Sequence, residues 1–353
     1  MRNTELRKRN FWMAAASLAL LLLTSLAAAC TKDADINKLF TVNSSAPAFV
    51  LYKPVSGRQV DFMFSTPVEV LDAKLEPDAA GTRWTAGETV SLFFEDEHST
   101  GAQMLVDMLV ADAQGSTLSL LLPFRTMNTR LPRILINEVR TQSSSGSVKR
   151  GEFIELKTFT AGNLGALRVF IARNGIEEPV YEFPPVEVAA GEYITLHIRT
   201  YPEDNAVDEL GGVESFELTK TTANANFASR DIWTHINAEL LRQSDAVYIL
   251  DQNGAVLDAV VFYNTEVEWE KYNALSQTVE MLAKQGAWLA KDGTPVENPT
   301  ANCAALNAGS TPTRTLCRDE TVSDSNTAND WYVCKDGGAT PGARNNPARY
   351  TKK

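Results

Sequence analysis

Apolar residues alternate with others along the first third of the chain, which predicts β-strands. Within residues 59–64 every second residue is a large apolar one, and the same period of two recurs in 89–94. A period of two places one face of each strand in a core. Further strands are expected at 48–52, 103–110 and 117–124. Short strands separated by proline and glycine turns predict a β-sandwich over residues 47–130.

A second set of strands begins after Arg130-Leu131-Pro132, which we interpret as a joint. The expected strands cover residues 133–141, 153–159, 167–172, 193–199, 244–250 and 255–263. Residues 251–254 carry a tight-turn signal, so the last two strands are expected to form a hairpin. Two segments interrupt the pattern, at 201–242 and 264–329. The chain is therefore predicted to form a second all-β domain over 131–350, with two insertions.

The second insertion opens with the one convincing helix signal, at 265–285. Thr265 and Glu268 fit a capping box at its start, and Gly286 suits its end. Its apolar residues recur at steps of three and four, which predicts an apolar stripe packed on the strands. The rest of this insertion, 291–329, is expected to be a long irregular loop.

Histidines and a few apolar pairs complete the pattern. His197 alternates with Leu196 and Ile198, so it is expected to face solvent. His98 follows a strand within an acidic stretch and is expected to lie in a solvated loop. In the first insertion, Ile232-Trp233 and Leu240-Leu241 are possible core residues.

The start of the chain resembles an export signal. Four basic residues lie within 2–9, the run 11–29 is uncharged, and Ala27-Ala28-Ala29 ends it. This order is typical of a secretory signal peptide over 1–29. A cysteine directly after the small residues, Cys30, resembles the cleavage box of bacterial lipoproteins. An uncleaved anchor helix, or an ordinary thiol beside a standard cleavage site, are the alternatives.

The lipoprotein resemblance implies that Cys30 is acylated and becomes the first residue of the mature chain. The polar segment 30–46 would then be a tether between the lipid bilayer and the first sandwich. Thr31, rather than an aspartate, follows the cysteine. In lipoproteins of Gram-negative bacteria this implies sorting to the outer membrane. The expected location is therefore the cell envelope, at the outer membrane or the cell surface.

Charge narrows the range of partners. The formal net charge is −11, and the predicted leader contains four basic residues and one acidic one, so the exported part is more acidic still. An acidic surface repels phosphate backbones, which argues against nucleic acid as a partner. It also argues against direct docking on anionic lipid, so membrane residence would require the lipid.

Three cysteines remain beside Cys30, namely Cys303, Cys317 and Cys334. Outside the cytoplasm the usual outcome is one disulfide and one leftover thiol. Their spacing does not resemble a zinc site.

Calcium is the best metal candidate, although it is a weak one. Asp324, Asn326 and Asp330 crowd one loop with oxygen ligands. The spacing is not that of an EF-hand, and a solvated loop is the simpler interpretation. We therefore expect no metal and no cofactor.

Several short sequence motifs of the second domain, taken in order, match the pattern of a known family. They are residues 134–139, 151–156, 190–194, 244–250, 256–258, 330–333 and 339–345. In this order they resemble the lamin tail domain, a β-sandwich of immunoglobulin type, over 131–347 apart from the insertions. In the first domain, the phrase 64–68 resembles the start of bacterial Ig-like modules. The expected architecture is thus two Ig-like sandwiches in tandem, the second with a helical insertion.

The resemblance also suggests roles for individual residues. It implies that the segment 313–318 lies beside the strand near 331, which favours a Cys317–Cys334 disulfide over the rival Cys303–Cys317. Asn137 and Glu138 would meet the chain returning at the C-terminus. Glu155, in an apolar strand, is expected to accept backbone N–H groups at the end of the sandwich, as a buried acid must. Pro341-Gly342 would turn the chain outward.

The residues provide no set typical of catalysis. There is no G-x-S-x-G elbow, no H-E-x-x-H and no Gly-rich phosphate loop. We therefore expect a non-enzymatic, lipid-anchored envelope protein with a binding, adhesion or scaffolding role, whose ligand is a protein or a polysaccharide. The alternative is a polymer- or carbohydrate-binding accessory module of an envelope hydrolase system. An exposed row among Trp84, Trp233, Trp269, Trp288 and Trp331 would favour that alternative.

Overall fold

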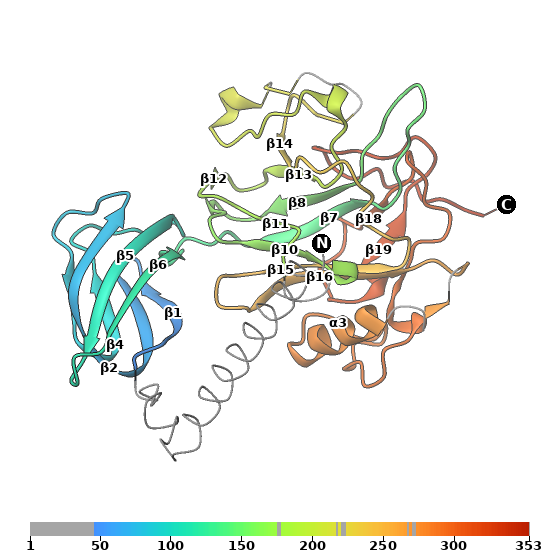
Figure 1. The fold of residues 1–353 in the computed structure, drawn as a ribbon. Coiled ribbons are helices and arrows are strands. Elements are labelled where there is room, and N and C mark those ends of the chain that lie inside the picture. Colours follow the sequence, from blue (N-terminus) through green and yellow to red (C-terminus); the bar gives the residue numbers. More distant parts are fainter. Residues whose placement is uncertain are drawn as a thin grey trace, which may run out of the picture.

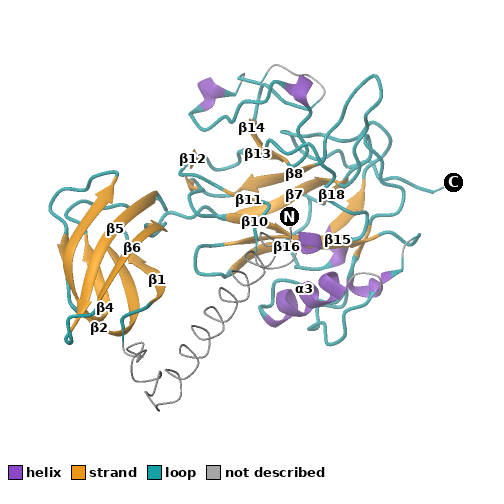
Figure 2. Cartoon of the chain, in the orientation of Figure 1, coloured by secondary structure: helices purple, strands orange, loops and turns teal. Residues whose placement is uncertain are grey.

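The computed structural model describes residues 46–174, 178–216, 218–219, 224–266, 268–269 and 273–352. Within them the chain is mainly β-strand, with several sheets and one α-helix (Figures 1 and 2). The expectation of an all-β fold is confirmed at this level. The leader, Cys30 and nearly all of the tether lie outside the described residues. No helix in the described ranges is long and apolar enough to cross a membrane.

The first unit is one sheet whose strands all pair antiparallel. Its strands are β1 (Phe49–Ser56), β2 (Gln59–Glu76), β3 (Arg83–Trp84), β4 (Gly87–Phe93), β5 (Gln103–Asp112) and β6 (Thr117–Arg125). Their order is β3-β4-β2-β5-β6, and β1 also pairs with β2. The first half of β2 pairs with β1 and β4, whereas its second half pairs with β5. The long strand β2 therefore joins both halves of the sheet around one core.

The predicted alternation holds in this unit. Val60, Phe62, Val90 and Leu92 have no exposed surface, while their strand neighbours Asp61 and Ser91 remain partly exposed. Apolar side chains on one face of each strand thus form the core, as the period of two predicts.

The second unit contains two larger sheets and a two-stranded ribbon. The first sheet has the order β14-β13-β8-β7-β18-β19 and the second the order β11-β10-β15-β16-β17, while β12 pairs with β9. The first sheet consists of β7 (Ile134–Arg140), β8 (Phe153–Thr158), β13 (Tyr193–His197), β14 (Arg230–Trp233), β18 (Leu316–Arg318) and β19 (Trp331–Val333). The others are β9 (Gly162–Asn163), β10 (Arg168–Ile171), β11 (Tyr181–Glu182), β12 (Glu187–Val188), β15 (Asp245–Leu250), β16 (Val256–Tyr263) and β17 (Ala305–Leu306).

The two larger sheets share one apolar core. Ile154 and Leu196 of the first sheet and Val247 and Phe262 of the second belong to the same fully buried cluster. Helix α3 (Asn273–Lys284) lies against the second sheet (Figure 1) and adds Val279 to this core. Short 3-10 turns occupy residues 172–174, 202–204, 213–215, 301–303 and 328–330.

Two local predictions are confirmed. Strands β15 and β16 form an antiparallel hairpin across residues 251–255, where the Asp251 carboxylate accepts the N–H groups of Asn253 and Ala255 at 2.8 Å. Helix α3 ends at Lys284, and Gly286, with φ +69°, follows two residues later, close to the predicted end. The N–H of Ala287 bonds to the carbonyl of Leu282 at 2.9 Å, which completes a Schellman motif. The predicted helix start lies partly outside the described residues.

The interpretation of the two insertions was wrong in part. Within 201–242, Ile232 and Trp233 are buried as expected, but they also form β14, which pairs in parallel with β13. Within 264–329, the expected loop supplies β18, which lies between β7 and β19 in the first sheet. Three-residue strands carry too little alternation to be recognised, and their partners fix them.

Candidate functional site

The face of the first sheet that points away from the shared core is polar, and other segments of the chain cover it. We call it the covered polar face; it comprises Glu138, Arg140, Glu155, His197 and Cys317. Each of these side chains is at most 3% exposed. Burying charge is costly unless partners compensate for it, so the partners of these groups reveal what the face does.

Glu155 forms hydrogen bonds that hold the C-terminal return, the segment near the C-terminus in which the chain comes back to this face. Its carboxylate accepts the side-chain N–H of Asn137 at 2.7 Å and the backbone N–H of Gly342. Burial raises its pKa well above the ordinary value. Gly342 has φ +77°, and a Cβ atom there would collide with Ser229 Oγ. The expected role of Glu155 as an acceptor of a backbone N–H is thus observed, and only glycine fits opposite it.

Glu138 fastens the same return segment one strand away. It accepts the hydroxyl of Thr315 and the backbone N–H of Thr340, the latter at 3.1 Å. The side-chain amide of Asn345 donates to the carbonyl of Asn137 at 2.9 Å. Asn137 and Glu138 therefore meet the returning chain where the sequence placed them. Burial raises the pKa of Glu138 to about 7, although these hydrogen bonds oppose the shift.

His197 corrects a prediction, since it is fully buried rather than solvent-facing. Its Nε2 lies 2.7 Å from Asp231 Oδ1, and its ring stacks on Trp233 at 3.8 Å between centroids. The alternation was interpreted correctly, because His197 does point away from the core. The error arose because residues of the segment 201–242 cover this face. The sequence pattern around His197 does not indicate that another segment lies over it. His98 lies in a loop as expected, partly buried against Phe94 at 4.6 Å.

The structure brings Cys317 and Cys334 together and leaves Cys303 apart. Both Cys317 and Cys334 are free thiols that contact the hydroxyl of Thr315, at 3.5 and 3.3 Å. Their mutual hydrogen bond raises the pKa of Cys317 and lowers that of Cys334 to about 6. The thiol of Cys303 instead lies 3.0 Å from the carbonyl of Thr300. Proximity favours Cys317–Cys334 over the rival pairing, and the disulfide itself stays a prediction.

The weak calcium candidates are engaged within the protein. Asp324 forms an ion pair with Arg318 at 2.6 Å, and Asp330 accepts the hydroxyl of Ser325 at 2.7 Å. Asn326 donates to the carbonyl of Gly286 at 3.4 Å. Across the described ranges, no group of three or more His, Cys, Asp or Glu residues could hold a metal ion.

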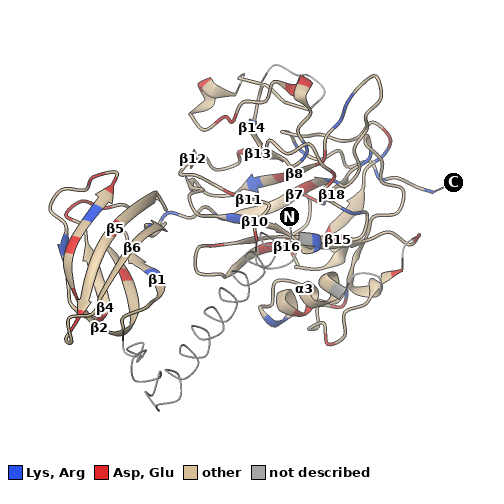
Figure 3. Cartoon of the chain, viewed as in Figure 1, with Lys and Arg blue, Asp and Glu red and all other residues tan. Residues whose placement is uncertain are grey.

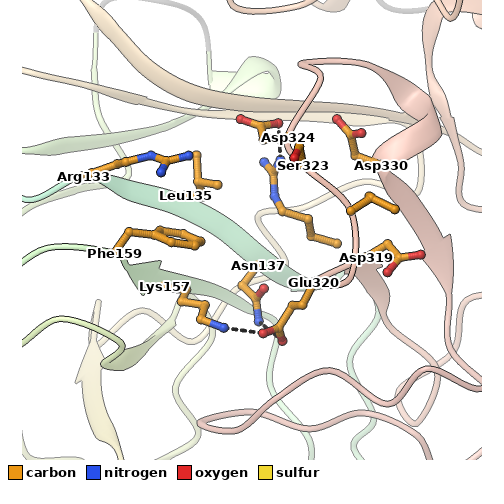
Figure 4. A pocket seen from close by; sticks show the side chains of 12 residues that line it. Arg133, Leu135, Asn137, Lys157, Phe159, Asp319, Glu320, Ser323, Asp324 and Asp330 are labelled. Atoms are coloured by element: carbon orange, nitrogen blue, oxygen red, sulfur yellow. Dashed lines mark hydrogen bonds and ion pairs between the residues drawn. The ribbon is translucent and has the colours of Figure 1, made fainter.

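A cavity of about 300 Å³ opens beside the covered polar face (Figure 4). Arg133, Leu135, Lys157, Phe159, Glu320 and Asp324 are among its lining residues. Lys157 pairs with Glu320, while the guanidinium of Arg133 lies over the Phe159 ring at 4.9 Å. No carboxylate of the described residues forms an ion pair with the exposed Arg133, although acidic side chains also line the cavity, namely Asp319, Glu320, Asp324 and Asp330. The sequence did not predict this cavity, because its lining residues come from β7, β8 and the loop after β18, which are far apart in the sequence.

Comparisons with known proteins place this region in a family. A family model described as "protein second domain" matches residues 132–333, more than half of the chain. The chain belongs to this family. The match begins at the joint between the two units.

Two further likenesses add little to that assignment. An uncharacterized protein of Treponema pallidum (strain Nichols) is 28% identical over 215 residues, which is 58% of this chain and 53% of the relative. The chain thus spans about half the length of this curated relative. The N-terminal part of the bacterial S-layer protein SbsC matches with a TM-score of 0.22 and 12% identity, over 39% of this chain and 37% of that one. A likeness this weak carries no argument about the fold.

Proposed function

We propose that the protein is anchored by a lipid on Cys30 in the cell envelope, at the outer membrane or the cell surface. There it binds a partner and has no catalytic activity. Support for the anchor comes from the charged head, the apolar run and the alanines before Cys30. The acidic net charge of −11 gives the protein little attraction to anionic lipid without such an anchor.

We further propose that both units are Ig-like sandwiches and that the second is a lamin tail domain. For the second unit, the shared core of the two sheets and the ties from Glu138 and Glu155 to the C-terminal return support this assignment. For the first unit, the support is one core enclosed by β1 to β6.

The observation that best supports the binding role is that buried polar groups hold the two units of the chain together. At the joint, the Asn128 amide donates to the carbonyls of Asn163 at 2.8 Å and Gly165 at 2.7 Å. A Cβ at Gly165 would collide with the carbonyl of Thr100, so the units approach through their backbones. The units are therefore expected to present one fixed surface, which suits binding and scaffolding.

The tryptophans weigh against the carbohydrate alternative. Trp233 and Trp288 have no exposed surface, and Trp269 and Trp331 are at most 9% exposed. Trp84 packs on the core of the first unit. None of these five forms an exposed stacking row, so the proposal favours a protein partner.

The anchor is tested by labelling cells with palmitate and fractionating their membranes. The wild-type chain should take up label and sediment with membranes, whereas Cys30→Ser should lose the label. Cys303→Ser is the matched control, since its thiol is buried in the second unit and is far from the leader in sequence, and it should keep the label. Label that persists in Cys30→Ser would refute the anchor.

The binding role is tested with the chain starting at Thr31, fixed to beads and exposed to envelope extract. A partner should be retained at constant stoichiometry, and Arg133→Glu should weaken its retention, because Arg133 is exposed at the rim of the cavity. Lys74→Glu on β2 also reverses an exposed charge, and it should leave retention unchanged. Turnover of an envelope polymer by the purified chain would contradict the non-catalytic role.

A further inference from the structure

Three strands of the first unit, β1, β3 and β6, have no partner strand on one side along their whole length, and they differ in how that side is protected. β3 has only two residues. β1 carries Lys53 and Pro54, and its pairing with β2 shifts register twice. Short length, lysine, proline and bulges are the usual devices that stop one sheet edge from joining another. Both of these edges are therefore blocked.

β6 is different. It has nine residues, pairs with β5 in one unbroken register, and contains no charge from Thr117 to Phe124 (Figure 3). No other strand of the described chain pairs with it. Its one protecting residue is Pro123, close to the end that meets the second unit. The distal part of β6 is thus a regular, uncharged and open edge.

The register shows which backbone groups of β6 point outward. Hydrogen bonds close the ladder at both ends, from Asp112 to Ser116 and from Thr126 to Ala102, each at 3.0 Å. Bonding and non-bonding pairs alternate in an antiparallel ladder. The even-numbered residues of β6 therefore bond to β5, whereas the N–H and C=O groups of Thr117, Ser119 and Leu121 face the open side. Pro123 also faces that side, where its missing N–H removes no ladder bond.

Side chains at this edge are left partly uncovered. Leu118, Leu120 and Leu122 pack on the core of the first unit but remain only partly buried. Leu121, on the opposite face, is 65% exposed. An added strand would satisfy the outward backbone groups and also cover these leucines.

We propose that β6 pairs with β6 of a second copy of this chain, antiparallel across a two-fold axis near Ser119. The edge requires an extended, uncharged and apolar segment, and β6 is itself such a segment. With the axis at Ser119, Thr117 of one copy faces Leu121 of the other. No charged residue then lies opposite another within the paired strands. The surface is distinct from the Arg133 cavity, and the inference does not rest on the lipid anchor.

Crosslinking tests the pairing directly. The full-length chain carrying Ser119→Cys is treated with a short thiol-to-thiol crosslinker, and Glu69→Cys is the matched control. Glu69 is also exposed on a strand, but it belongs to β2, which lies between β4 and β5 in the sheet, and it pairs with Ala111 of β5. Ser119→Cys should give at least tenfold more dimer than Glu69→Cys. Equal yields, or a crosslink of the introduced thiol on β6 to a different protein in cells, would overturn the proposal.

A second measurement avoids new cysteines. In sedimentation, the full-length chain should run as a dimer and Ser119→Lys as a monomer, because the two introduced lysines would lie opposite each other at the axis. Ser119→Thr keeps an uncharged strand former at the same position and should stay dimeric. A wild-type chain that remains monomeric at every concentration at which it stays soluble would rule out the pairing.

Discussion

The two units of the molecule differ in the kinds of side chain that they bury. The core of the first unit, from β1 to β6, is made of apolar side chains. Of its buried polar residues, Thr126 and Asn128 lie at the joint, and Asp112 accepts backbone N–H groups in the turn between β5 and β6. The second unit buries many ionisable groups, including Glu138, Arg140, Glu152, Glu155, His197, Arg230, Asp231, Asp258 and Arg318. Most of these link segments far apart in the sequence. One unit therefore depends on packing, and the other on packing together with a polar network.

A cavity in the first unit should have the largest effect. Phe62 is fully buried among Tyr52, Trp84 and Phe124, with ring centroids 5.3 to 6.5 Å away. Phe62→Ala should lower the free energy of unfolding of this unit by about 3–5 kcal/mol. Calorimetry should show the transition of this unit moving down the most, while that of the second unit falls only by the smaller coupling through the joint. If both move equally, the contrast between the units is wrong.

A change of pH should alter the stability of the second unit and leave that of the first unit nearly unchanged. Glu138, with a pKa of about 7 in the fold against an ordinary 4.5, binds its proton more tightly when folded. Its contribution to stability is complete below about pH 4.5 and is lost as pH rises towards 7, up to about 3 kcal/mol. Burial shifts Glu152 and Asp245 in the same direction, each to about 7.

Thermal unfolding between pH 5 and pH 8 measures this effect. The transition of the second unit should fall as pH rises, and Glu138→Gln should flatten that slope. The first unit should hardly respond, and Phe62→Ala serves as a marker of its transition. An unchanged slope in Glu138→Gln would show that other groups carry the dependence.

Oxidation should strengthen the polar unit at one defined place. A disulfide between Cys317 and Cys334 would close a short loop between β18 and β19 and stabilise the unit by about 3 kcal/mol in the chain-entropy view. Peptide mapping after mild oxidation should find this pair and a free Cys303. Cys303→Ser should oxidise normally, and recovery of a Cys303–Cys317 peptide instead would contradict the placement.

The contrast also explains which features the sequence could predict. Alternation located the first part of β2, together with β4 and β5, and the 251–254 turn located the hairpin, because these signals are local. Glu155 and Gly342 could be singled out, since an acid in an apolar strand and a Pro-Gly pair are unusual. The burial of His197, the place of β18 and the Arg133 cavity could not be predicted. Each depends on a segment that lies far away in sequence and carries no pattern of its own.

A single methyl group tests the fit of the C-terminal return. Gly342→Ala adds a Cβ that meets Ser229 and strains a backbone with φ +77°. The loss should be about 1–3 kcal/mol, confined to the second unit. Gly337→Ala is the matched control, because Gly337 has φ +67° but open space around its Cβ position. Chemical denaturation of the two variants separates the collision from the backbone strain, and equal losses would leave no role for the contact with Ser229.

The smallest expected effect lies at the joint, where the two kinds of unit meet. Asn128→Ala removes the bonds to the carbonyls of Asn163 and Gly165, each worth about 1 kcal/mol. Because Asn128 stabilises neither core, its loss should leave both transitions near their own temperatures but uncouple them. In double variants with Phe62→Ala, the second unit should then become insensitive to unfolding of the first. Asn253→Ala, at an exposed hairpin turn, should leave the coupling intact. If Asn128→Ala behaves like Asn253→Ala, the Asn128 amide does not hold the units together. The fixed surface on which the proposed binding role depends must then come from the Arg125–Glu182 ion pair and the close contact of Gly165 with Thr100.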